Sequence, residues 1–243
     1  MFFPIKDYNP TKKTAYITII FIIINVVVFF YQSYLSGKSL NYHIVKSAMV
    51  PAEVTHFRNM PVLVGENRFT GQPVYYRGRD ISPFVSLLTS LFMHGSFLHL
   101  FGNMLFLWIF GNNIEDHLGK MKFIFFYFAA GVGASLTHIL FNFNSLIPVI
   151  GASGAVSGVM GAYLILYPQA RVKTLVFIFF FITFVDIPAF VFLIVWFIFQ
   201  FFYVGGGSGI AWLAHVGGFI IGILLIKAMQ KKQKPYIDVE IIQ

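Results

Sequence analysis

The sequence predicts an all-α membrane protein with six transmembrane helices and a long outer loop between the first and the second. Of the 243 residues, 58% are hydrophobic and only 11% are charged, and the mean hydropathy is +0.77. In soluble domains, roughly a quarter of all residues are charged. The apolar residues also form blocks near the length of about 20 residues that a helix needs to cross a bilayer. The chain length suits one domain.

Each apolar block gives one expected span. The first is too long for a typical signal peptide and lacks a small-residue cleavage site, so we expect it to be retained. The loop 36–85 contains no block that could span, and we expect it to lie on the membrane surface as amphipathic elements. The expected parts are a cytoplasmic segment 1–14, a membrane domain 15–229 with spans at about 15–35, 97–114, 123–141, 150–167, 188–204 and 209–229, and a basic cytoplasmic tail 230–243.

The fifth block is ambiguous. It runs from Leu175 to Val204 and is interrupted by Asp186-Ile187-Pro188. A proline and the residue before it disfavour one continuous helix through this point. Either Leu175–Val185 is a short separate span, or it is interfacial and the span is 188–204. A helix of the first length would cover only about 16 Å, roughly half of the hydrocarbon core, which favours six spans.

Basic residues orient these spans. With six spans, the short basic segments all fall on one side, and short loops count most for orientation. That side would carry Lys6, Lys12, Lys13, Lys120, Lys122, Arg171, Lys173, Lys227, Lys231, Lys232 and Lys234. We therefore expect both termini in the cytoplasm, and a bacterial inner membrane as the location. The net charge of +8 is attributed to residues that flank spans, and no nucleic-acid partner is expected.

Polar side chains inside a span are functional candidates by default. The fourth span begins with Gly151-Ala152-Ser153-Gly154, and Gly158 follows one turn later. Gly154 and Gly158 form a small-xxx-small pair that allows another helix to approach closely. Alone, this string is also typical of a packing helix whose serines bond to their own backbone carbonyls.

The sixth span carries His215, followed by Gly218 and Gly222 on the same helix face. A face that combines a histidine with glycines can pack closely against another helix. Taken alone, His215 could equally be a buried histidine whose ring bonds to a carbonyl.

On the second span, His99 and Asn103 are four residues apart, so both project from one face. Both can donate hydrogen bonds to a common point. His94 lies nearby, but no Glu follows it, as the helical His-Glu-x-x-His metal pattern requires. The chain contains no cysteine, which excludes thiolate ligands. We expect no metal and no cofactor.

Glu115 lies at the cytoplasmic end of the second span, away from these groups in depth. It can accept hydrogen bonds from loop amides or from the N-terminus of a helix. We expect a structural role for it.

The expected topology places Ser153, His215 and His99 at one depth, roughly 5–10 Å below the outer surface. A serine becomes nucleophilic when a neighbouring base accepts its proton, and a histidine can do so near neutral pH. Asn103, His99 and the backbone N–H of Ser153 could then stabilise the oxyanion. No Asp or Glu is expected at that depth, so the sequence predicts a Ser153–His215 dyad without a third acid.

Together these residues resemble the rhomboid family of intramembrane serine proteases, in its bacterial six-span form. The resemblance rests on His99-x-x-x-Asn103, Gly-Ala-Ser153-Gly and Ala-His215-x-x-Gly in this order, covers about residues 90–230, and includes Gly111-x-x-x-Glu115-x-x-x-Gly119. It implies a hydrolase that cleaves transmembrane protein substrates near the extracytoplasmic face of the lipid bilayer. It also implies that the fifth span and the loop of Gly205, Gly206, Gly207 and Gly209 move to admit substrate.

Two positions depart from the family pattern. Phe84-Val85-Ser86 stands where many members carry Trp-Arg, and Ser157 stands where an aromatic side chain often packs on the catalytic histidine. The sequence therefore does not show how the ring of His215 is held. The alternatives are an inactive rhomboid-like protein that binds membrane clients and, with less support, a transporter. A transporter would show polar groups at several depths and repeated halves, which the sequence lacks.

Overall fold

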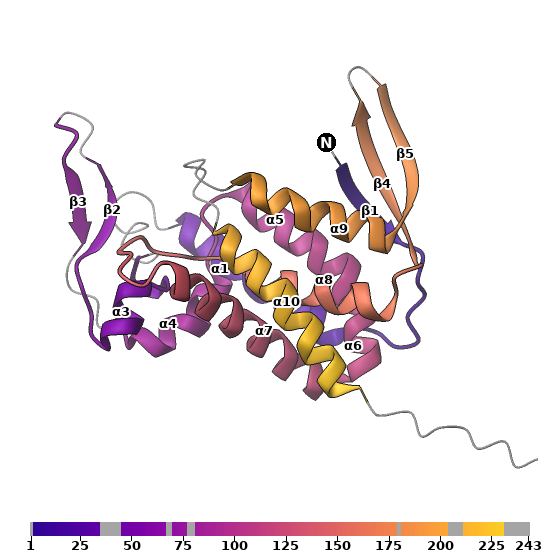
Figure 1. Ribbon diagram of the computed structural model, residues 1–243, viewed down its shortest axis with the longest axis horizontal. Helices are drawn as coiled ribbons and strands as arrows, with labels where there is room; N and C mark the ends of the chain where they lie inside the picture. The colour runs from indigo at the N-terminus through magenta and orange to yellow at the C-terminus, as the bar shows by residue number, and fades with distance from the viewer. Residues whose placement is uncertain are drawn as a thin grey trace, which may run out of the picture.

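The computed structural model describes residues 2–34, 45–66, 70–76, 81–178, 181–203 and 211–230. Its centre is a bundle of helices (Figure 1). The bundle consists of α1 (Tyr16–Tyr34), α5 (Phe97–Phe106), α6 (Asn112–Leu118), α7 (Lys120–Phe141), α8 (Ser153–Leu166), α9 (Ala189–Gln200) and α10 (Trp212–Met229). Helix α5 continues through the π-helical segment η2 (Leu107–Gly111) into α6, and the 3-10 turn η3 (Phe201–Tyr203) follows α9.

Four helices of the described chain are long and apolar enough to cross a membrane. They are Tyr16–Tyr34, Phe97–Leu118, Lys120–Phe141 and Trp212–Met229, whereas α8 and α9 are shorter apolar helices. Each of the six blocks expected from the sequence contains or overlaps a helix, and the number of spans stays a prediction. The glycines at 205, 206, 207 and 209 lie outside the described residues.

Helix α8 occupies the core of the bundle. It packs against α7 and α10, and all its residues from Gly154 to Tyr163 are buried. Its C-terminal half contacts large aromatic side chains, among them Phe110, whose ring lies edge-on to that of Tyr163 at a centroid distance of 4.9 Å. Burial of α8 on all sides explains why its sequence is small and apolar around the whole circumference, since a helix of that kind has no solvated or lipid-facing stripe.

The prediction of a mostly helical membrane bundle is confirmed, but the class is not purely α, because the described residues also contain a three-stranded antiparallel sheet. Strands β4 (Arg171–Ile178) and β5 (Phe181–Pro188) form a hairpin, and β1 (Phe2–Asp7) pairs with β4. The sheet projects from one end of the bundle (Figure 1). The short helical span considered for 175–185 is therefore wrong, and α9 begins directly after Pro188. The segment forms strands because β-branched and aromatic residues dominate it, and these residues favour extended backbone.

The sheet is tied to the bundle through Asp7. Its Oδ2 accepts hydrogen bonds from Asn113 Nδ2 at 2.7 Å and from the Tyr163 hydroxyl at 2.6 Å. Burial raises the pKa of the Asp7 carboxyl, and these two donors oppose that effect. The N-terminal strand is thus joined by side chains to α6 and α8.

The segment between α1 and α5 contains short elements. Helices α3 (Pro51–His56) and α4 (Pro83–Thr89) flank a hairpin of β2 (Val62–Glu66) and β3 (Pro73–Tyr76), and the 3-10 turn η1 (Ser90–Phe92) follows α4. The hairpin lies at the opposite end of the molecule from β4 and β5 (Figure 1). Met49 pairs with Val149 through backbone bonds of 3.0 and 2.7 Å, so this segment contacts the connection that leads into α8.

Candidate active site

Ser153 is the first residue of α8 and is half-buried. The connection before it is held by a bond of 2.9 Å from Gly151 N–H to the Ser90 carbonyl. Gly151 has a φ of +127°, and a Cβ built on it would lie 2.8 Å from the His99 ring. Both the backbone conformation and the close ring therefore require glycine here. The turn that Gly151 makes places Ser153 beside His99.

His215 lies in the first turn of α10, and glycines bring that helix against α8. A Cβ on Gly218 would collide with the Gly154 carbonyl, and a Cβ on Gly222 with the main chain of Gly158. The two backbones are thus in direct contact, as a small-xxx-small face allows. This contact brings the N-terminal turns of α8 and α10 together.

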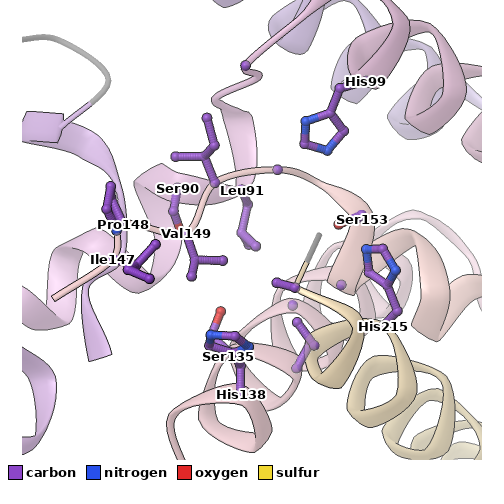
Figure 2. A pocket seen from close by; sticks show the side chains of 18 of the residues that line it. Ser90, Leu91, His99, Ser135, His138, Ile147, Pro148, Val149, Ser153 and His215 are labelled. Carbon is purple, nitrogen blue, oxygen red and sulfur yellow. The ribbon is translucent and has the colours of Figure 1, made fainter. Parts of the chain in front are cut away.

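Ser153, His215 and His99 line one cavity of about 630 Å³. Figure 2 shows the rings of His99 and His215 on either side of Ser153. A second cavity of about 320 Å³ is lined by the same three residues together with Asn103. No hydrogen bond joins Ser153 and His215 in the part of the chain that the structure describes. Such bonds are often long in structures without substrate and shorten when substrate binds.

Asn103 follows His99 by one helical turn of α5 and is buried. Its Nδ2 lies 2.9 Å from Nε2 of His94, a residue in the connection between η1 and α5. Gln32 of α1 holds that connection through the backbone N–H and carbonyl of His94, at 3.3 and 3.4 Å. The sequence places His94 near the site, but its spacing does not indicate that it would contact Asn103.

His94 is buried, and burial, together with the neighbouring His99, lowers its pKa to about 3. The ring is therefore neutral near neutral pH. A neutral ring can leave Nε2 unprotonated, so that it accepts the bond from the Asn103 amide. The amide orientation of Asn103 is fixed in this way.

Three further residues near the cavities were missed in the sequence. Gln200, at the end of α9, has its Oε1 2.7 Å from Nδ1 of His215. Trp196, one turn earlier, has its ring 6.1 Å from the ring of His215. His138 of α7 lines the larger cavity (Figure 2). Gln200 carried a signal, because it is the one amide in a helix that is otherwise apolar.

Ser157 lies one turn after Ser153 and is not a hydrogen-bond partner of His215 among the described residues. Its hydroxyl donates to the carbonyl of Ser153 at 2.6 Å. This is the bond to the helix's own backbone that serines make within apolar helices. The hydrogen-bond partner of the His215 ring comes instead from α9.

Glu115 belongs to α6, binds the N-terminus of α1 and lines neither cavity. Its two carboxylate oxygens accept bonds from the N–H groups of Ile17 at 2.9 Å and Thr18 at 2.7 Å. The first N–H groups of a helix lack partners within the helix and carry partial positive charge. Glu115 therefore fixes the start of α1 against α6.

Comparison with known proteins shows which family the chain resembles. The family profile of the Rhomboid domain matches residues 82–232, which is more than half of the chain. Rhomboid protein 1, mitochondrial, of Saccharomyces cerevisiae is 31% identical over 168 residues, covering 62% of this chain and 44% of the relative. RHOMBOID-like protein 5 of Arabidopsis thaliana is 37% identical over 78 residues, covering 32% of this chain and 25% of the relative.

Rhomboid protease GluP of Bacillus subtilis is 40% identical over 78 residues, covering 32% of this chain and 15% of the relative. The chain thus matches less than half of the length of each of these relatives. They include mitochondrial and bacterial proteins, so the expected bacterial inner membrane stays a prediction.

The fold and the cavities define an integral membrane protein in which a serine, histidines and amides from several helices surround a polar space. The chain belongs to the rhomboid family. The family resemblance read from its motifs is confirmed, and its bacterial six-span form stays a prediction.

Proposed function

We propose that this protein is an intramembrane serine endopeptidase. It cleaves transmembrane protein substrates near the extracytoplasmic face. It has six spans with both termini in the cytoplasm, and its location is the bacterial inner membrane. The observation that carries the proposal is the shared cavity, which brings Ser153, His215 and His99 together from the N-terminal turns of three helices. The name of the similar Bacillus subtilis protein, a rhomboid protease, supports the same activity.

In the proposed mechanism, Ser153 Oγ attacks the carbonyl carbon of the scissile peptide bond. His215 accepts the proton of the hydroxyl through Nε2 as the new C–O bond forms. His215 then gives this proton to the leaving amine, and the C–N bond breaks to leave an acyl ester on Ser153. A water molecule, deprotonated by His215, attacks the ester and releases the second product with the serine restored.

Three donors are available for the oxyanion of the tetrahedral intermediate. His99 and Asn103 lie on the wall of the smaller cavity with Ser153. The N–H of Ser153 lies in the first turn of α8, where backbone N–H groups have no partner within the helix. Donors fixed in a site that excludes water stabilise developing charge strongly.

No Asp or Glu lines either cavity among the residues that the structure describes. The proposal is therefore a Ser–His dyad without a carboxylate. A buried carboxylate would also be costly at membrane depth.

The test is cleavage of a model transmembrane substrate by the purified protein in detergent, with a fluorophosphonate label mapped by mass spectrometry. Wild type should cleave the substrate and carry the label on Ser153. Ser153→Ala should lose both, and His215→Ala should lose nearly all of both. Ser157→Ala is the matched control, because it removes a serine hydroxyl one turn away, and it should keep the label.

Wild-type protein that neither cleaves nor takes up the label under several conditions would refute the proteolytic function. Wild-type-like cleavage by Ser153→Ala would refute the assignment of the nucleophile. Co-purification of uncleaved substrate with the wild type would point instead to an inactive client-binding protein.

A further inference from the structure

Gln200 reaches His215 from a different helix. The Oε1 atom of Gln200 lies 2.7 Å from Nδ1 of His215, and the Gln200 side chain is only 4% exposed. Gln200 ends α9, whereas His215 lies in the first turn of α10. The contact joins the inner face of one helix to the proposed base on another.

A second hydrogen bond fixes the orientation of the Gln200 amide. Its Nε2 donates to the backbone carbonyl of Trp196 at 2.9 Å. A carbonyl can only accept, so the NH₂ group must face Trp196 and Oε1 must face His215. Because Oε1 can only accept as well, Nδ1 of His215 must carry the hydrogen.

This protonation pattern determines what the other ring nitrogen can do. In a neutral imidazole one nitrogen carries the hydrogen and the other has a lone pair. With the hydrogen on Nδ1, the lone pair is on Nε2. That is the form of His215 that can accept the proton of Ser153 in the proposed mechanism.

The ring plane is also held from α9. The ring of Trp196 lies 6.1 Å from that of His215 at an interplanar angle of 33°, and Trp196 stacks on Phe219 of α10 at 6.0 Å. Ser157 makes its hydrogen bond to the Ser153 carbonyl and so provides no such support. Helix α9 thus supplies both the hydrogen-bond acceptor and the flat surface for His215.

An amide is suited to this place in a membrane protein. Burying an amide costs free energy unless its hydrogen bonds are made, and both polar ends of Gln200 have partners. An ionised carboxylate would cost far more in the same surroundings. The described lining of the cavities holds no Asp or Glu, and its other titratable groups are His99 of α5 and His138 of α7.

We propose that Gln200 is a positioning residue of the active site, which selects the Nδ1–H tautomer of His215 and orients its ring toward Ser153. The unit would then be Ser153–His215–Gln200, with a neutral third member in place of an acid. This inference rests on the proteolytic function proposed above and adds the residue that makes the base competent.

The test compares three variants with the wild type in detergent. Gln200→Met has a similar volume but no acceptor, and Gln200→Glu places a carboxylate at the same atom. Asn25→Leu is the matched control. Asn25 is also a fully buried amide whose Nδ2 bonds to the carbonyl four residues earlier, at 2.7 Å, but it lies on α1 and lines neither cavity.

Gln200→Met should lower kcat and the rate of fluorophosphonate labelling about 10- to 100-fold, because a hydrogen bond to a group that becomes charged is lost. KM should stay the same, and the slow label should still map to Ser153. Gln200→Glu should recover much of the rate and move the acidic limb of the pH–rate profile to higher pH, because a carboxylate favours the protonated ring. Asn25→Leu should change thermal stability without changing kcat per folded molecule.

Nitrogen-15 NMR of the wild type gives a readout that needs no substitution at Gln200 and no cleavage. The His215 signal, assigned by its loss in His215→Ala, should show a protonated Nδ1 and an unprotonated Nε2 near neutral pH. A hydrogen on Nε2 would overturn the inference.

The inference would also be overturned by unchanged kcat in Gln200→Met, by a loss no larger than the loss of folded protein, or by an unmoved acidic limb in Gln200→Glu. In each of these cases the wild type still cleaves and labels, so the proteolytic function stands. If the wild type neither cleaves nor labels, both proposals fail.

Discussion

The carboxylate of Glu115 binds Thr18 twice, through the backbone N–H at 2.7 Å and through the hydroxyl at 2.9 Å. Thr18 is 1% exposed and Glu115 is 3% exposed, so water replaces neither bond if the carboxylate is removed. The contact joins residues 97 positions apart and fixes α1 to α6, and neither residue lines a cavity.

The first prediction follows from this contact. Glu115→Leu should lower the free energy of unfolding by about 3 kcal/mol, because buried donors left without an acceptor cost about 1–3 kcal/mol each. Thermal or denaturant unfolding in detergent measures it. Asp116→Ala is the control, since Asp116 accepts an exposed bond from Lys12 N–H at 2.7 Å and its loss should cost little. Equal stability of the two variants would contradict the prediction.

The second prediction concerns the contact of α8 with α10. Gly222→Ala places a Cβ against the main chain of Gly158, where no side chain can move aside. The variant should lose about 1–3 kcal/mol of stability, as overpacked cores do, and label more slowly at Ser153 because the two helices separate. Unfolding and labelling rates measure the two effects.

Gly102→Ala serves as its control for stability. Gly102 also lies in a helix, but apart from the backbone of its own helix no atom lies within 4 Å of a Cβ built there. Its stability should stay the same or rise by about 0.4–1 kcal/mol, because the unfolded chain loses freedom. The prediction for Gly222 is wrong if both glycines tolerate alanine equally well.

The third prediction concerns Asn103. Asn103→Ala should lower kcat roughly 100- to 1,000-fold with little change in KM, because an oxyanion donor acts in the transition state and not in the bound substrate. Residual cleavage above that of Ser153→Ala should remain. Steady-state kinetics with a soluble fluorogenic substrate would show it. A rise in KM with unchanged kcat would mean that Asn103 binds substrate instead.

The fourth prediction is a pH dependence from His94. Its pKa in the folded protein is about 3, against an ordinary value of 6.5. Below pH 6.5 the unfolded chain takes up a proton that the folded protein does not, so this residue lowers stability as the pH falls from 6.5 toward 3. The contribution approaches about 1.4 kcal/mol per pH unit.

His94→Gln should reduce that dependence by about one proton, because the glutamine cannot titrate and its Oε1 can still accept from Asn103 Nδ2. Denaturant unfolding at a series of pH values between 4 and 8 measures the slope. Identical slopes for the wild type and the variant would show that His94 is not the group responsible.

Much of the helical framework could be predicted because apolar blocks have a direct physical meaning in a membrane protein. The block at 123–141 lies within α7, which is Lys120–Phe141, and the block at 209–229 contains α10, which is Trp212–Met229. Hydropathy alone does not separate a helix from a strand. The hairpin of β4 and β5 was missed for that reason, although Val172, Thr174 and Val176 alternate as buried residues with period two.

The residues singled out by motif, Ser153, His215 and His99, do line one cavity, and their catalytic roles stay proposals. What the sequence could not provide was contact between elements. His94 precedes α5 and still contacts Asn103 within it, a contact that no helical spacing predicts. Gln200 was missed for a different reason. It is a polar side chain in an apolar helix, and the rule that singles out such side chains applies to α9 as well as to the other helices.

The direct contact of Gly154 with Gly218, and of Gly158 with Gly222, has a consequence for how the protein tolerates different membranes. No side chain separates the two backbones, so no rotamer change can alter the spacing of α8 and α10. A thinner or thicker bilayer is accommodated by tilt of helices or by the lipid itself. Such tilting would carry α8 and α10 as one unit, so the separation of Ser153 and His215 should be insensitive to the length of the lipid chains.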